Sequence, residues 1–274
     1  MLFRSLSSKP VMALVSDSIL KCKSIQEIDQ LVLQTPSEHF GSISCSMALS
    51  KLGQYKSPNP HSLQKLLAVA ETQRFNPKTL SATLQALANG RLVSRFPDFL
   101  LEKLQATNVK DFTPRDFSTV LWSFARIGHR QDQVWQQFTL QIEATDEFLS
   151  KFNAIDLSNT MWALATLHRR NSGETEKVCE VILKELESRE LDKFQAQNLV
   201  NLVWALAKMN HLNCKEFASR VSMEICDRRE TKEFTPQGIS NLLWAYQKLH
   251  QPHLPLANKF VHEILQPSFK VLGL

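Results

Sequence analysis

The feature that most constrains this chain of 274 residues is an internal repeat. Four segments begin with phenylalanine, share the order of their apolar residues and carry a tryptophan ten residues after the phenylalanine. They read FTPRDFSTVLWSFARIG from Phe112, FNAIDLSNTMWALATLH from Phe152, FQAQNLVNLVWALAKMN from Phe194 and FTPQGISNLLWAYQKLH from Phe234. Weaker copies, FGSISCSMALSKLGQY and FNPKTLSATLQALANG, begin at residues 40 and 75. A chain that repeats every 35–42 residues is expected to stack similar units on one another.

Each copy has the hydrophobic period of a helix. With the leading phenylalanine counted as position 0, apolar residues recur at positions 5, 8, 9, 12 and 15, which share one helix face. A threonine or asparagine at position 1 is a typical helix start, and Gly90 and Gly128 stand where such a helix should end. The segments between the copies carry a second amphipathic period, and only seven glycines occur in the chain. The prediction is an all-α fold, a right-handed-type α-solenoid of about six helix-pair repeats of 35–42 residues.

We expect these repeats to occupy residues 17–274, with starts near residues 40, 75, 112, 152, 194 and 234, an opening helix at 21–33 and a last partner helix at 253–266. Residues 1–16 differ, because they contain Arg4, Lys9 and several serines but no acidic residue. This composition is typical of an organellar transit peptide and predicts a mitochondrion, or alternatively a plastid; a plain N-terminal tail is the other interpretation. No apolar run is long enough for a membrane span.

The helices that contain the tryptophan also resemble a known motif. The stretches SNTMWALATL (158–167), VNLVWALAKM (200–209) and SNLLWAYQKL (240–249) resemble the octotricopeptide-repeat family of organellar RNA-binding proteins, which is related to heptatricopeptide-repeat and FAST kinase-domain proteins. Residues 21–55 resemble the way such arrays begin, so that the resemblance covers nearly all of the chain after residue 20. It implies an RNA-binding solenoid in an organelle. Such families often end in a RAP domain, for which we expect no room after Trp244.

Polar residues of the repeats fall on one stripe of the expected first helix, at positions 3, 14, 7, 11 and 4. Side-chain amides can pair with base edges and neighbouring cations can hold phosphates, which makes this concave stripe a candidate RNA-binding surface. Alternatively, the repeated asparagines form a structural ladder with the next repeat, and the lysines only complement the helix dipole. The candidate residues are Arg115, Gln197 and Gln237 at position 3, Thr119, Asn159, Asn201 and Asn241 at position 7, and Arg126, Lys208 and Lys248 at position 14.

The tryptophans at position 10 lie opposite the main apolar face, beside a small residue at position 13. We predict a structural role, with each ring packed between successive repeats; stacking on RNA bases is the alternative. The four residues are Trp122, Trp162, Trp204 and Trp244.

The net charge of +5 is distributed unevenly along the chain. Residues 36–111 hold nine basic and five acidic side chains, whereas residues 112–274 hold nineteen of each. The first two repeats are therefore a second candidate site for phosphate, although a merely soluble surface would have the same composition. The residues predicted to contribute are Lys51, Lys56, Lys78, Arg91 and Arg95.

No pattern of catalytic or metal-binding residues is found. The chain lacks a P-loop, GxSxG, HExxH and CxxC, and we expect no enzyme activity, metal, cofactor or small-molecule substrate. Histidines 129, 168, 211 and 250 recur just after the first helix of their repeats, as helix-end residues would, and Cys179 is predicted to be buried.

The sequence thus predicts an organellar RNA-binding protein, a structural or stabilising component of a mitochondrial ribosome or another RNA–protein assembly. Its partners would be ribosomal RNA or an organellar transcript and other proteins; the alternative is an RNA-independent interaction scaffold.

Overall fold

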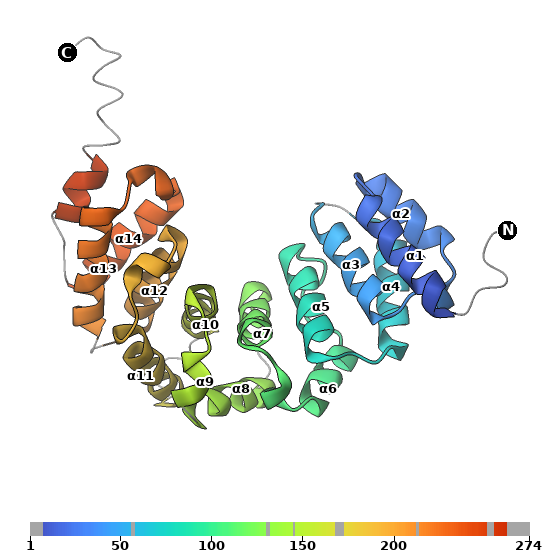
Figure 1. Ribbon diagram of the computed structural model, residues 1–274, viewed down its shortest axis with the longest axis horizontal. Coiled ribbons are helices and arrows are strands. Elements are labelled where there is room, and N and C mark those ends of the chain that lie inside the picture. Colours follow the sequence, from blue (N-terminus) through green and yellow to red (C-terminus); the bar gives the residue numbers. More distant parts are fainter. Residues whose placement is uncertain are drawn as a thin grey trace, which may run out of the picture. The chain divides into compact units, whose positions relative to one another are not determined.

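The computed structural model describes residues 8–55, 58–129, 132–144, 146–167, 173–211, 214–250 and 255–261, and over these residues the protein is all-helical, without a strand (Figure 1). Two compact units make up the chain, Met1–Phe138 and Thr139–Leu274. Their boundary falls inside helix α8 (Asp132–Ala144).

In the first unit, alternate helices pack against one another in series. Helices α1, α3, α5 and α7 each contact the next one, and α3 also contacts α2 and α4, which lie against each other (Figure 1). The bounds are α1 Ser8–Lys21, α2 Ile25–Gln34, α3 Ser42–Gly53, α4 Pro60–Thr72, α5 Pro77–Asn89, α6 Asp98–Ala106 and α7 Pro114–Ile127. The opening helix therefore begins at residue 25, after a break that follows α1, and not at residue 21 as predicted.

The second unit has the same alternation. Helices α10, α12 and α14 contact one another in series, α10 contacts α11, α12 contacts α13, and α11 contacts α13. The bounds are α9 Asp146–Ser150, α10 Ala154–Leu167, α11 Gly173–Glu187, α12 Ala196–Met209, α13 Lys215–Arg228 and α14 Pro236–Lys248, followed by helical residues 255–261. We call α3, α5, α7, α10, α12 and α14 the first helices, because each begins one of the six sequence copies, and the helices that follow them the second helices.

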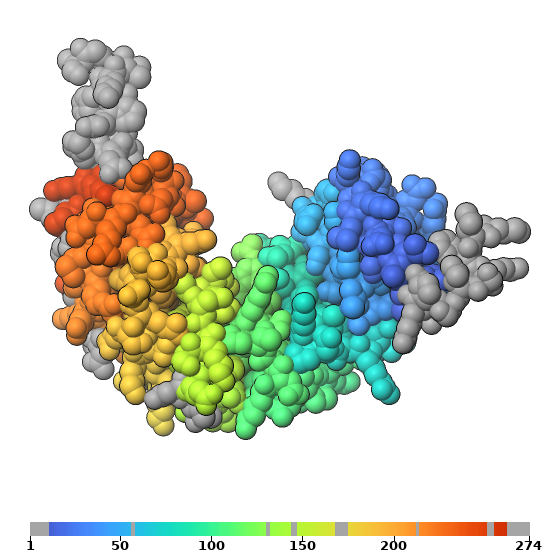
Figure 2. Space-filling view, in the orientation of Figure 1, coloured from blue at the N-terminus to red at the C-terminus, as the bar shows by residue number. Residues whose placement is uncertain are grey.

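The periodic apolar positions form the core of each unit, and side chains fill the space between neighbouring helices (Figure 2). In α10, positions 5, 8, 9 and 12 are Leu157, Thr160, Met161 and Leu164, and all four are fully buried. The leading phenylalanine is also buried in five of the six copies, the exception being Phe75.

The predicted helix starts and ends are confirmed where their caps are described. The Thr113 hydroxyl accepts a hydrogen bond from the N–H of Asp116 (3.2 Å), and the Asn76 side chain accepts one from the N–H of Thr79 (2.8 Å). Both residues hold position 1 and satisfy N–H groups that the first helical turn leaves free. Gly128 ends α7 with a φ of +69°, in the left-handed region that favours glycine.

Buried polar bonds connect successive first helices. The Ser81 hydroxyl of α5 donates to a carboxylate oxygen of Asp116 in α7 (2.8 Å), and the Asn198 amide of α12 donates to the Ser158 hydroxyl of α10 (3.0 Å). In both pairs, position 6 of one helix meets position 4 of the next. A buried polar side chain is costly without a partner, so these bonds fix the register of neighbouring repeats.

Helix α1 includes part of the predicted leader. Residues 8–16 lie in α1, where Val11 and Val15 are buried together with Ile19, and α1 packs on α3. Residues 1–7 lie outside the described residues. Cleavage after residue 16 would therefore remove two valines from the core of the first unit.

We expect Ile19→Ala to destabilise the first unit by about 3 kcal/mol, because it leaves a cavity where a fully buried side chain packs. Leu20→Ala on the exposed face of the same helix should change the free energy of unfolding by less than about 1 kcal/mol. Urea denaturation followed by circular dichroism measures both. Equal, small effects of the two substitutions would show that α1 is not part of the core.

Two of the repeat-phased histidines are partly buried at helix ends. The Nδ1 of His129 accepts a hydrogen bond from the N–H of Phe96 (3.0 Å), while the Nδ1 of His211 is buried without a partner among the described residues. Burial lowers the pKa of both imidazoles below 6.5, and at His129 the charge of Arg95 acts in the same direction. His168 lies outside the described residues.

These pKa values predict how stability depends on pH. The unfolded chain takes up a proton on each imidazole near pH 6.5 and the folded chain only at lower pH, so stability should be full above pH 6.5 and fall as the pH drops below it. His129→Asn keeps an acceptor but cannot titrate, and it should make the loss of unfolding free energy between about pH 7.5 and 5.5 smaller. An unchanged loss would exclude His129 as its source.

Candidate nucleic-acid interface

One row of residues faces solvent on every first helix. Repeat positions 3, 7, 10 and 14 are exposed or half-buried in all six helices, and they follow the i, i+4, i+7, i+11 spacing of one helix side. We call these four positions of a helix its strip. The strips are Ile43, Met47, Ser50 and Gln54; Lys78, Ala82, Gln85 and Asn89; Arg115, Thr119, Trp122 and Arg126; Ile155, Asn159, Trp162 and Thr166; Gln197, Asn201, Trp204 and Lys208; and Gln237, Asn241, Trp244 and Lys248.

The strip is narrower on one side than the predicted stripe. Positions 4 and 11 were expected on the same surface, but Asp116 and Asn198 at position 4 and Ser123 and Ala205 at position 11 are buried. Position 4 is buried because it bonds to position 6 of the preceding first helix in the pairs described above. The prediction was wrong for these two positions.

The amides of the strip are presented to solvent. In α12 the Gln197 side chain donates to the Asn201 amide oxygen (2.8 Å), a bond that orients both groups within one strip. The side chains of Thr119, Asn159 and Asn241 form no hydrogen bond with another described residue. The hydrogen bonds described above between successive first helices are thus made by positions 4 and 6 and not by position 7.

The cations of the strip are exposed and unpaired. Arg115, Arg126, Lys208 and Lys248 form no ion pair within the described residues, and no strip position holds an aspartate or glutamate. The Nζ of Lys208 lies 4.8 Å from the centroid of the Trp204 ring, a cation–π distance. The acidic residues gather elsewhere, for example on the second helix α11, where Glu176, Glu180 and Glu187 are exposed.

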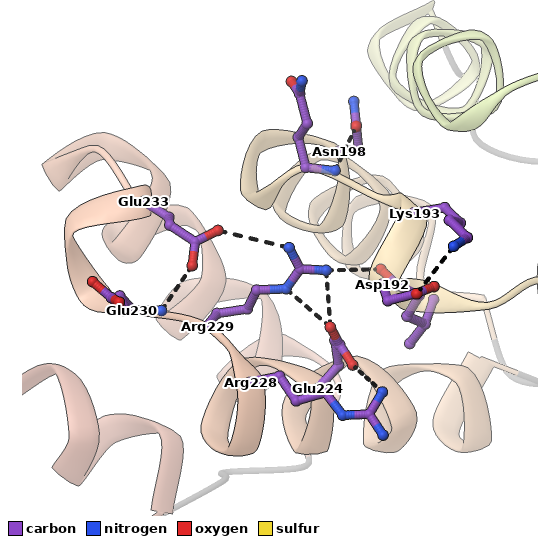
Figure 3. A network of polar contacts seen from close by, with 10 residues as sticks. Asp192, Lys193, Asn198, Glu224, Arg228, Arg229, Glu230 and Glu233 are labelled. Atoms are coloured by element: carbon purple, nitrogen blue, oxygen red, sulfur yellow. Dashed lines mark hydrogen bonds and ion pairs between the residues drawn. The ribbon is translucent and has the colours of Figure 1, made fainter.

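Many cations outside the strips already have a structural partner. Arg229, at the end of α13, contacts the carboxylates of Glu224 and Glu233 and donates to the carbonyl of Leu191 (3.0 Å) (Figure 3). Arg220 donates to two carbonyls at the end of the preceding second helix, and Lys65 to the carbonyl of Thr35 (2.7 Å). These contacts occupy part of the donor capacity of such cations and hold their side chains against the protein.

The basic residues predicted to bind phosphate in the first two repeats fall into the same two groups: those that contact the protein itself and those that are exposed on a strip or beside it. Lys51 donates to the carbonyl of Cys22 (3.0 Å), and Arg95 forms an exposed ion pair with Asp98 (2.6 Å). Lys78 is exposed at position 3 of the α5 strip, and Arg91 is exposed just after α5 with a φ of +47°. Lys56 lies outside the described residues. Only Lys78 of this set belongs to a strip.

The structure places the four repeat tryptophans on the strips. Trp122, Trp162 and Trp204 are half-buried and Trp244 is 46% exposed, so none belongs to the fully buried core. The sequence alone could have indicated that the tryptophans lie on the strips, because position 10 is only about 20° from position 3 around a helix.

Cys45 of the first unit and Cys179 of the second unit are buried. Burial raises the pKa of the Cys45 and Cys179 thiols to about 12, so both are unreactive at neutral pH. The described residues contain no group of three or more histidine, cysteine, aspartate or glutamate side chains arranged to hold a metal. None of the described helices is long and apolar enough to cross a membrane.

Comparison with models of protein families and with curated proteins gives no match for this chain. The resemblance to octotricopeptide repeats therefore depends on the tryptophan-containing motifs and on residues 21–55 of the sequence itself.

Proposed function

We propose that this protein is an RNA-binding α-solenoid of about six helix pairs, which holds RNA along the strips of its first helices. The observation that carries the proposal is the composition of the strips: five of their side chains are cationic, several are amides, and none is a carboxylate. A surface that binds a polyanion needs this separation of charge, because an acidic residue would repel phosphate.

The two kinds of polar residue have different tasks in this proposal. Lysine and arginine at positions 3 and 14 neutralise phosphates, which supplies affinity without sequence preference. The asparagines and glutamines at positions 3 and 7 offer a donor and an acceptor to base edges. Exposed acidic side chains lie on second helices such as α11 and not in the strips, so they do not repel the phosphates of the RNA.

We further propose an organellar role, in a mitochondrion or alternatively a plastid, as a structural or stabilising component of a ribosome or another RNA–protein assembly. The basic, serine-rich residues 1–16 and the resemblance to octotricopeptide repeats support the compartment. Fusion of residues 1–24 to a fluorescent protein tests it, and a reporter that stays in the cytosol would contradict it.

RNA binding by the full chain is the decisive test. Fluorescence anisotropy with a mixed-sequence RNA of about 12 nucleotides should show binding whose logarithmic affinity falls linearly with the logarithm of salt concentration. Absent binding, or binding that salt does not weaken, would contradict the proposal.

A protein partner is the second candidate, and the apolar members of two strips favour it. Ile43 is 59% exposed on α3 beside Met47, and Ile155 is exposed on α10. These strips would suit a peptide or protein surface better than a phosphate backbone. Affinity purification with and without RNase separates the two functions, because partners retained after RNase treatment support the scaffold.

A further inference from the structure

The position of the repeat tryptophans points to a binding role that rests on the proposed function. We propose that the indole rings at position 10 are stacking platforms for unpaired RNA bases, so that the strips bind bases as well as phosphates. Four of the five tryptophans in the chain are involved: Trp122, Trp162, Trp204 and Trp244.

The first argument is burial. A tryptophan that served only to fill the core would be enclosed like Phe117 or Phe217, which are fully buried. Trp244 is instead 46% exposed, and the other three repeat tryptophans are half-buried. A large indole kept at the surface at the same position of four helices is available for contact with a ligand.

The second argument is what surrounds the ring. Position 10 lies one helical turn after the residue at position 7 and one turn before the residue at position 14. In α12 this places Trp204 between Asn201 and Lys208, and in α14 it places Trp244 between Asn241 and Lys248. One nucleotide offers a flat base, a polar base edge and a phosphate, and each has a matching side chain within one strip.

The third argument is the orientation of the Trp204 ring. The Nζ of Lys208 lies 4.8 Å from its centroid, so a face of the indole is turned toward an exposed, flexible cation and not wholly against other helices. A base that stacks on this face displaces the ammonium group, which is then free to pair with a phosphate. Stacking and charge neutralisation would thus occur together.

This interpretation predicts the kind of RNA that binds. Base faces are covered by neighbouring bases inside a duplex, but they are accessible in a single strand. Binding should therefore favour unpaired RNA. It should also depend on the bases themselves and not only on the number of phosphates.

The test compares two ligands of about 12 nucleotides, a mixed-sequence RNA and a ribose-phosphate strand of equal length without bases. The wild-type protein should bind the RNA more tightly by about tenfold for each ring engaged. Trp204→Leu combined with Trp244→Leu should lower that preference by about 100-fold, tenfold for each ring removed. Trp135→Leu is the matched control, because Trp135 is half-buried on α8 outside the strips and should keep the preference.

The outcomes separate this inference from the proposed function. If the wild-type protein binds RNA with the expected salt dependence but binds the abasic strand equally well, the stacking role is wrong and the RNA-binding function stands. If neither ligand binds, both are wrong. The comparison of ligands on the wild-type protein needs no variant, so misfolding of the leucine variants, checked by circular dichroism, cannot obscure the result.

Discussion

Replacement of Arg126, Lys208 and Lys248 together by glutamine is expected to weaken RNA binding by about 100-fold at 0.1 M salt. Each cation that neutralises a phosphate of a single strand contributes about 0.7 to the slope of logarithmic affinity against logarithmic salt, which corresponds to about fivefold at this concentration. The variant should also have a salt slope lower by about 2. Anisotropy titrations over a series of salt concentrations measure both quantities.

A matched control removes the same charge from surfaces outside the strips. Lys110, Lys177 and Lys215 are exposed near the end of α6, on α11 and on α13, and none holds a strip position. Their triple replacement by glutamine should alter affinity only slightly, through the smaller net charge of the protein. If both triple variants lose affinity equally, the interaction is a general attraction of charges and the strips are not the binding surface.

The all-helical fold was predictable because the signal is local and recurs. Four of the six copies carry a threonine or asparagine at position 1 and each copy has its own apolar period, as Thr113 and the buried positions of α7 illustrate. Such features depend on neighbours a few residues away. The prediction for the opening helix failed at its start, because Ser24 caps α2 and separates it from α1.

The width of the candidate site was harder to predict because it depends on contacts between helices. Position 4 is polar in α7 and α12, which suggests exposure when one helix is considered alone. The sequence does not indicate that Asp116 meets Ser81 or that Asn198 meets Ser158, each pair 35 or more residues apart. Polar residues that satisfy one another in the interior look like surface residues in a single sequence.

Charge counting gives an incomplete description of the first two repeats for a related reason. The excess of basic residues at 36–111 suggested one phosphate site, but a basic side chain can also bind a carbonyl or a carboxylate of the protein itself. Lys51 and Arg95 do so, whereas Lys78 remains exposed on a strip. The cations that we propose to bind RNA therefore stand out by their repeat position and their exposure, and not by local composition.

Because cations repeatedly link structural elements, replacing one of them is expected to have a large effect on stability. Arg229→Met should destabilise the second unit by about 3 kcal/mol, because it removes the main partner of a buried carboxylate. Glu224 is 6% exposed and Arg229 13% exposed in this pair, at 2.8 Å. The variant also loses the bond to the carbonyl of Leu191, which joins α13 to the turn before α12. Urea denaturation followed by circular dichroism measures the change.

Two further variants show whether the buried charge is the cause. Arg228 also contacts Glu224, at 3.3 Å, but its side chain is 70% exposed, so Arg228→Met should cost less than about 1 kcal/mol. Combining Arg229→Met with Glu224→Met removes both charges and should restore most of the lost stability, because well-packed apolar side chains can replace a buried ion pair. A double variant no more stable than Arg229→Met alone would mean that the link to Leu191, and not the isolated carboxylate, accounts for the loss.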